Sequence, residues 1–203
     1  ISKSTQALRA LNLPPGLDIE NGKNIGWLEA RGLPGLQNLF EEIQTPSTTP
    51  GHNPIKINSV GNTVKFYGVN RSAFYLAQSA VDFAENGKNV SIKNCRFPLL
   101  ILAEMARRKH LSFGFKVQWI EEEKINTGSS ISGNSEITLN SRKLVAAYDL
   151  KITAAKDLTI KNPLEILSQE KGAKKYGIGS NRNHWEAICA TAQKVLVSDS
   201  KQS

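Results

Sequence analysis

The sequence predicts a protein of the α+β or α/β class, with a small mixed sheet and packed helices. Two observations lead to this. Apolar residues alternate on both sides of a Gly-Asn pair, as in a hairpin, and two alanine- and leucine-rich segments with helical periodicity then alternate with short β-like segments. Because these segments follow one another within residues 60–120, we expect a central unit in the order strand, helix, strand, helix, strand.

Composition is that of an ordinary globular protein. The chain has 203 residues, of which 39% are hydrophobic and 22% charged, enough for one large domain or two small ones. No apolar run approaches the roughly 20 residues of a membrane span, and the N-terminus lacks the apolar core of a signal peptide. We expect a cytoplasmic protein without a membrane partner. Since the chain begins at Ile1, we also expect a piece of a longer polypeptide.

The domain division follows from proline and glycine. Residues 1–45 predict a helical segment broken by these residues, and residues 46–54 read as a linker rich in proline and threonine. Residues 55–125 would then form the central α/β unit. Residues 126–203 are expected to form a C-terminal segment of strand and helices packed on it.

The first half of the central unit is expected to contain a hairpin and a helix. The hairpin would turn at Gly61 and Asn62, which separate two runs of alternating apolar residues. A helix follows over residues 70–87, with Asn70 as its N-cap and Gly87 as its stop.

The second half repeats this order. Residues 89–94 predict a strand, and Pro98 fits the first turn of a second helix that ends in the basic run at 106–110. Apolar residues then alternate over residues 111–120, which predicts a strand with one buried face.

The C-terminal segment is less regular. The Ser-, Gly- and Asn-rich residues 125–136 predict a loop, and residues 135–141 a strand. Residues 142–161 fit helix early and strand late, so both remain open. Helices are expected from Pro163 and from Asn183, the latter as the start of a capping box.

Basic residues concentrate in the middle of the chain. Residues 61–120 hold nine basic and three acidic residues. A basic excess concentrated in one segment is a stronger indication of contact with a nucleic-acid backbone than a diffuse one. A lysine-rich solvated surface is the alternative. Tyr67, on the strand face opposite Phe66, is a further exposed aromatic candidate. The predicted nucleic-acid-binding residues are Lys88, Lys93, Arg96, Arg107, Arg108 and Lys109.

Residues 174–188, "KKYGIGSNRNHWEAI", form a candidate anion site. Lys174, Lys175 and Arg182 would flank free backbone N–H groups at a helix start. The dinucleotide fingerprint fails here, because Arg182 stands where a third glycine is needed. In an alternative reading as a nuclease, His184 would act as an acid with Arg182 and Lys174. In another, these residues only end one helix and begin the next.

No established catalytic or metal motif is present in the sequence. His52, His110 and His184 have no ligand partner at metal-binding spacing, so neither a metal nor a cofactor is expected and an enzyme is not favoured. Cys95 and Cys189 are expected to be free thiols in apolar segments.

Residues 60–118 resemble a known family, the accessory domain found behind conjugative relaxases and in other large polyvalent mobile-element proteins. The segment "NCRFP" departs from the small-residue step usual in that family, and no catalytic residue can be carried over. The resemblance implies a module of a large DNA-processing protein. The matching positions are Val64, Phe66, Ala73, Ala77, Ala80, Ala84, Gly87, Val90, Ile92, Ala103 and Ala106.

Charge and resemblance together predict a non-catalytic nucleic-acid-binding or docking module of a bacterial conjugation protein. Its partners would be the DNA backbone and other proteins of a transfer complex. Two alternatives stay open: a secreted nuclease toxin domain acting on RNA, and a domain that only docks other proteins.

Overall fold

The chain folds into two compact units. One combines two separate stretches of the chain, and the other consists of a single stretch. In this computed structural model, residues 1–50 and 164–203 form a helical unit, and residues 51–163 form a sheet unit. The described residues are 2–46, 56–67, 71–108, 114–121, 124–131, 134–138, 147–155, 172 and 179–198.

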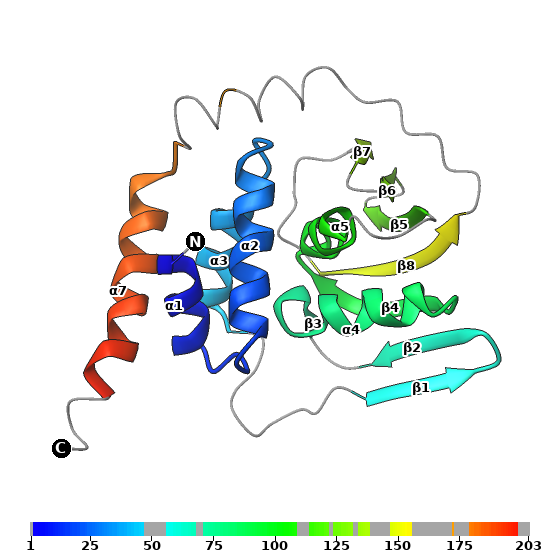
Figure 1. Cartoon of the computed structure of the whole chain (residues 1–203), viewed down its shortest axis with the longest axis horizontal. Coiled ribbons are helices and arrows are strands. Elements are labelled where there is room, and N and C mark those ends of the chain that lie inside the picture. The colour runs from blue at the N-terminus through cyan, green and yellow to red at the C-terminus, as the bar shows by residue number, and fades with distance from the viewer. Residues whose placement is uncertain are drawn as a thin grey trace. The chain divides into compact units, whose positions relative to one another are not determined.

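The helical unit joins the two ends of the chain. Helix α7 packs against α1 and α3, and α2 packs against both of its neighbours in sequence (Figure 1). Leu8, Leu28, Leu39 and Ile188 are completely buried and form the core of this unit. Its described helices are α1 (Ser2–Ala10), α2 (Leu17–Glu29), α3 (Gly35–Gln44) and α7 (Arg182–Ser198).

A buried carboxylate fixes the turn between α1 and α2. Asp18 is fully buried and accepts hydrogen bonds from Gly16 N at 3.0 Å and from the side chain of Arg9 at 2.9 Å. Burial opposes the ionisation of Asp18, but these bonds outweigh it and hold the pKa of this carboxyl below its ordinary value. The ion pair therefore ties the end of α1 to the start of α2.

The sheet unit contains an eight-stranded mixed sheet in the order β1-β2-β4-β8-β5-β6-β7, with the short β3 paired to β4. Strand β2 runs parallel to β4, while the hairpins and both pairings of β8 are antiparallel. The strands are β1 (Lys56–Val60), β2 (Thr63–Tyr67), β3 (Arg71–Ser72), β4 (Asn89–Arg96), β5 (Gly114–Glu121), β6 (Lys124–Ile131), β7 (Asn134–Thr138) and β8 (Ala147–Ala155).

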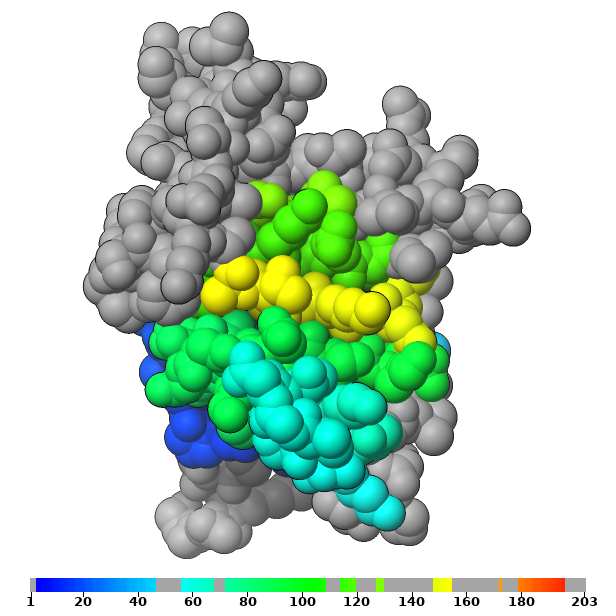
Figure 2. All heavy atoms as spheres, turned by 90° about the vertical axis from the view of Figure 1, so that its right-hand side faces the viewer, coloured from blue at the N-terminus to red at the C-terminus, as the bar shows by residue number. Residues whose placement is uncertain are grey.

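Two helices, α4 (Ala73–Glu85) and α5 (Pro98–Arg107), cover one face of this sheet. Alternate strand residues such as Phe66, Ile92 and Trp119 are buried on that face. Figure 2 shows neighbouring segments in the order of the sheet: β1 and β2 are cyan, residues 71–108 are green and β8 is yellow.

The predicted fold class is confirmed. The central order appears as β2, α4, β4, α5 and β5, and the hairpin turns at Gly61, whose φ is 58°. Gly87 ends α4 with φ 74°, as predicted. Asn70 lies outside the described residues, and Ser72 caps α4 by accepting a hydrogen bond from Phe74 N.

The Ser-, Gly- and Asn-rich run predicted as a loop is instead strand β6. Its pairing with β5 depends on backbone groups, so it needs few apolar side chains. Gly128 lies close to α5, since a Cβ at this position would lie 3.0 Å from the end of the Leu102 side chain.

The expected C-terminal segment at 126–203 is divided between the two units. Strands β6, β7 and β8 belong to the sheet, whereas α7 belongs to the helical unit. In the ambiguous stretch 142–161, residues 147–155 form β8, which pairs with β4 and β5. Such pairing between distant segments leaves no local signal in the sequence. The helix expected from Pro163 and most of the linker lie outside the described residues.

Among the described residues, no helix combines the length and the apolar character needed to cross a membrane.

Asn38 on α3 gives a stability prediction. Its side chain is fully buried, and neither its Oδ1 nor its Nδ2 has a hydrogen-bond partner. Because an unpaired buried amide is costly, Asn38→Leu should raise the free energy of unfolding by about 1–2 kcal/mol in urea titrations. Asn38→Asp keeps the shape but buries a charge and should destabilise the protein. If Asn38→Leu lowered the free energy of unfolding and Asn38→Asp left it unchanged, the amide would have a partner, which would contradict this prediction.

Candidate functional site

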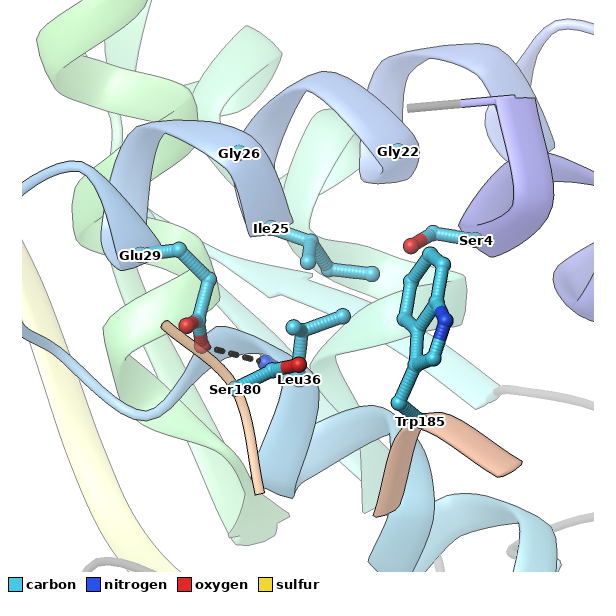
Figure 3. Close-up of a pocket in the computed structure, with 8 residues that line it drawn as sticks. All are labelled: Ser4, Gly22, Ile25, Gly26, Glu29, Leu36, Ser180 and Trp185. Carbon is cyan, nitrogen blue, oxygen red and sulfur yellow. Dashed lines mark hydrogen bonds between the residues drawn. The ribbon is translucent and has the colours of Figure 1, made fainter. Parts of the chain in front are cut away.

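The helical unit contains a pocket of about 390 Å³. Helix α2 forms one side, α1 and α3 contribute one residue each, and the start of α7 closes the other side (Figure 3). A hollow of this size is in the range that proteins use for small molecules. Its lining residues are Ser4, Gly22, Ile25, Gly26, Glu29, Leu36, Ser180 and Trp185.

One face of α2 supplies half of the lining. Gly22, Ile25, Gly26 and Glu29 follow the i, i+3, i+4, i+7 spacing that places residues on one helix face. Each glycine in a helix interior costs roughly 1 kcal/mol relative to alanine. Two glycines on the pocket face therefore leave room for a ligand at the expense of helix stability.

Glu29 is held at the start of α3. Its Oε1 accepts the backbone N–H of Leu36 at 2.7 Å, one of the N–H groups that a helix start leaves without an internal partner. Helix α3 comes this close because residue 35 is glycine: a Cβ on Gly35 would lie 2.7 Å from the carbonyl oxygen of Ile25. Close packing of α3 on α2 thus positions the carboxylate.

The surroundings of Glu29 favour proton binding. Burial raises the pKa of this carboxyl above its ordinary value, while the N–H groups of Leu36 and Gly35 and the charge of His184 act in the opposite direction. A carboxyl with a raised pKa that lines a pocket is suited to accept or donate a proton.

The α7 side of the pocket is aromatic. Trp185 lines the pocket and is 39% exposed, and Figure 3 shows Ile25 and Ser4 pointing toward its indole ring, with Glu29 at the other end. His184 does not line the pocket; its ring stacks on Phe40 with 4.4 Å between the ring centroids. The pocket therefore has a polar end at Glu29 and an apolar end at Trp185.

The predicted cap of α7 is wrong by two residues. Asn181 caps the helix, since its Oδ1 accepts the N–H groups of Asn183 at 2.9 Å and of His184 at 3.4 Å. Glu186, expected to complete a capping box with Asn183, instead accepts a hydrogen bond from Arg182 at 2.7 Å.

Of the predicted anion-site residues, only Arg182 lies among the described residues. Arg182 is paired with Glu186, and Asn181 occupies N–H groups that an anion would need. Lys174 and Lys175 lie outside the described residues. The grouping of His184, Arg182 and Lys174 for a nuclease therefore has no described geometry, and the His184 ring is packed on Phe40.

Arg108, predicted to contact nucleic acid, is instead enclosed by carboxylates. Its guanidinium lies 2.7 Å from Asp82, 2.7 Å from Glu85 and 2.9 Å from Glu104, and its side chain is only 14% exposed. Burial disfavours the charge, but these hydrogen bonds outweigh burial and raise the pKa of Arg108. Arg107 lies 3.8 Å from the same Glu104. Arg108 therefore joins the end of α5 to α4, whereas the Arg107 pair lies within α5.

The other predicted basic residues are dispersed. Lys93 pairs with Asp149, the Arg96 guanidinium lies 4.6 Å from the centroid of the Phe97 ring, and Lys88 is half-buried. Lys109 lies outside the described residues. Their role in binding nucleic acid stays a prediction. As expected from strand alternation, Tyr67 is exposed and Phe66 is buried.

Cys95 is buried and Cys189 partly exposed, and both are free thiols. Burial raises the pKa of the Cys95 thiol, which makes it unreactive. Within the part of the chain that the structure describes, no group of three or more His, Cys, Asp or Glu side chains could hold a metal ion.

Comparison with solved structures reveals a similar fold in two proteins named as dehydrogenases. The chain is similar to a dehydrogenase from Sinorhizobium meliloti, with a TM-score of 0.60, 10% identity, and coverage of 94% of this chain and 96% of the other. It is also similar to an E. coli protein to which malate/lactate dehydrogenase activity has been ascribed, with a TM-score of 0.59, 9% identity, and coverage of 95% and 92%. At these identities the likeness concerns the fold.

No protein-family model matches the sequence, and no curated protein is significantly similar to it. The resemblance of residues 60–118 to the relaxase accessory domain therefore stays a prediction.

The predicted function, however, is wrong. We expected a non-catalytic module of a DNA-transfer protein, but the fold over nearly the whole chain is that of structures named as dehydrogenases. Part of the basic charge in the sequence is paired in the fold. Arg108 pairs with Asp82, Glu85 and Glu104, and the exposed Lys93 pairs with Asp149, which is distant in sequence.

The sequence-based search missed the pocket. A signal was present in "NGKNIGWLE", where two glycines and a glutamate recur on one helix face. Gly22, Gly26 and Glu29 line a pocket only together with Ser180 and Trp185, which are distant from them in sequence.

The Arg108 cluster gives a second prediction. Arg108→Ala would leave the buried carboxylate of Glu104 and the partly buried one of Glu85 without this cation, so the free energy of unfolding should fall by about 2–3 kcal/mol in urea titrations. Lys65→Ala is the control, because Lys65 is exposed on β2 and should change stability by no more than about 0.5 kcal/mol. Equal small effects of both substitutions would contradict a structural role for Arg108.

Glu29 gives a pH prediction. Because its folded-state pKa is raised, the stabilisation from its bound proton is present below the ordinary value of 4.5 and is lost as the pH rises through the raised pKa. Relative to Glu29→Gln, which does not titrate, the wild type should lose stability across that window. Parallel stability curves for the two proteins, measured by chemical denaturation at several pH values, would show that the pKa is not raised.

Proposed function

We propose that this chain is an enzyme acting on a small molecule, which binds in the pocket of the helical unit with Glu29 as the proton-transferring group. The observation that carries this proposal is the placement of Glu29, a partly buried carboxyl with a raised pKa, at the polar end of an open hollow. Glutamate with such a pKa is a common general acid or base.

The similar structures suggest the kind of reaction. One is named as a dehydrogenase and the other has been ascribed activity on malate or lactate, both of which carry a hydroxyl group. We therefore propose a substrate with a hydroxyl or carbonyl group. Glu29 would take the proton of a hydroxyl, or return it to a carbonyl oxygen, while Leu36 N–H holds the carboxylate in place.

A nicotinamide dinucleotide, the usual hydride acceptor of dehydrogenases, does not fit the lining of this pocket. Its two phosphates require N–H donors or basic side chains, whereas among the described residues of the lining only Glu29 is charged. The N–H groups at the α7 start are already bound to Asn181. We therefore derive no hydride-transfer step here and assign this pocket to the substrate.

The low helix propensity of the two glycines in α2 gives a second argument for the same proposal. Gly22 and Gly26 weaken the helix, and both face the pocket. A substrate bound beside these two positions would account for glycine at both of them.

Filling the pocket should separate stability from function. Gly26→Leu adds a good helix former that projects into the pocket, so the protein should stay folded or gain up to about 1 kcal/mol while losing ligand binding. Binding would be measured by ligand-observed NMR with a panel of small alcohols and amino alcohols.

Lys23→Leu is the matched control for this substitution. It introduces the same side chain on the exposed face of α2, away from the pocket, and should leave binding unchanged. Unaltered binding in a folded Gly26→Leu variant would refute the assignment of the pocket as the substrate site.

A further inference from the structure

We infer that the pocket takes a substrate with a flat aromatic ring, which lies between the indole of Trp185 and the glycine-bearing face of α2 and directs its hydroxyl or carbonyl group toward Glu29. This inference rests on the proposed function of the same pocket, since it names the class of substrate that would bind there. It distinguishes this chain from the similar structure to which activity on malate or lactate has been ascribed, because neither molecule contains a ring.

Trp185 gives the pocket an aromatic wall. Its side chain lines the pocket and is partly exposed, although tryptophan has a large apolar surface that proteins usually bury. Two aromatic rings in offset-stacked or edge-to-face contact attract each other beyond the burial of their apolar area. A ligand with a ring would use this wall more fully than a ligand with a short carbon chain.

The opposite wall is thin where α2 carries glycine. Gly22 and Gly26 lie one helical turn apart, and both line the pocket. A residue without a Cβ lets a ligand approach the backbone closely. A flat ring gains most from this approach, because its whole face can contact the helix surface. Ile25 points toward the indole ring from the same helix and adds an apolar contact (Figure 3).

Contacts within the helical unit fix the start of α7, which carries Trp185. The N–H of Trp185 donates to the carbonyl oxygen of Asn181 at 3.0 Å. The preceding residue, His184, stacks on Phe40 of α3 with 4.4 Å between the ring centroids, and the start of α3 is itself bound to Glu29. The aromatic wall and the polar end are thus held in one arrangement, which lowers the entropic cost of binding a rigid ligand.

The size of the pocket suits one ring with a short polar arm. Its volume of about 390 Å³ lies at the lower end of the range for small-molecule pockets. With a ring against Trp185 and a hydroxyl group at Glu29, a simple ligand of this class is an aryl alcohol. Benzyl alcohol is therefore the probe for this inference.

Two compounds test the selection of an aromatic ring. Benzyl alcohol and cyclohexylmethanol each carry one hydroxymethyl group on a six-membered ring, which is flat and aromatic in the first and puckered and saturated in the second. Binding to the whole chain would be measured by ligand-observed NMR titration. The saturated ring is the more apolar, so apolar burial alone would favour cyclohexylmethanol. We expect benzyl alcohol to bind about two- to tenfold more tightly instead, as one aromatic pair would predict.

Two substitutions of Trp185 identify the source of this preference. Because Trp185 is partly exposed, neither should unfold the chain. Trp185→Leu removes the aromatic wall and should abolish or reverse the preference for benzyl alcohol, whereas Trp185→Phe keeps a ring and should preserve it. A preference of unchanged size in Trp185→Leu would overturn the inference.

The remaining outcomes separate this inference from the proposed function. Equal binding of the two ring compounds by the wild type, or tighter binding of cyclohexylmethanol, would overturn the aromatic assignment. Binding of the small alcohols without binding of either ring compound would overturn it as well. In these cases the pocket remains the substrate site if Gly26→Leu abolishes the binding that is seen. Binding that persists in a folded Gly26→Leu variant would overturn the proposed function and this inference with it.

Discussion

The close approach of α3 to α2 is the constraint on which the pocket depends. Gly35 lets the α3 backbone reach the carbonyl of Ile25 at a distance that no side chain would permit. This contact brings the N–H of Leu36 to Glu29, which satisfies a helix start and fixes the carboxylate in one step. Any larger residue at position 35 would push α3 outward and separate the two.

The same packing explains the chemistry available to Glu29. A carboxylate with full access to water would keep its ordinary pKa, and one buried without N–H donors would be far more costly. In Glu29, burial raises the pKa of the carboxyl, and Leu36 N–H, Gly35 N–H and the charge of His184 act in the opposite direction. A pocket with Glu29 at one end and Trp185 at the other can then hold a small polar molecule with a defined orientation.

In the sheet unit, the ordering constraint is β8. It lies between β4 and β5 and so joins the two halves of the sheet by backbone pairing. Arg108 performs a related task for the helices, because it links the end of α5 to Asp82 and Glu85 of α4. Charges that looked like a binding surface in the sequence serve here to hold the fold together.

The sequence by itself determined what depends on neighbours along the chain: the hairpin at Gly61, the alternation that buries Phe66 and exposes Tyr67, and the stop of α4 at Gly87. These follow from local periodicity and backbone preference. Only the tertiary structure decided that residues 147–155 form a central strand and that Arg108 is paired, since both depend on partners distant in sequence. The pocket belongs to this second class, because it exists only where α2 meets the start of α7.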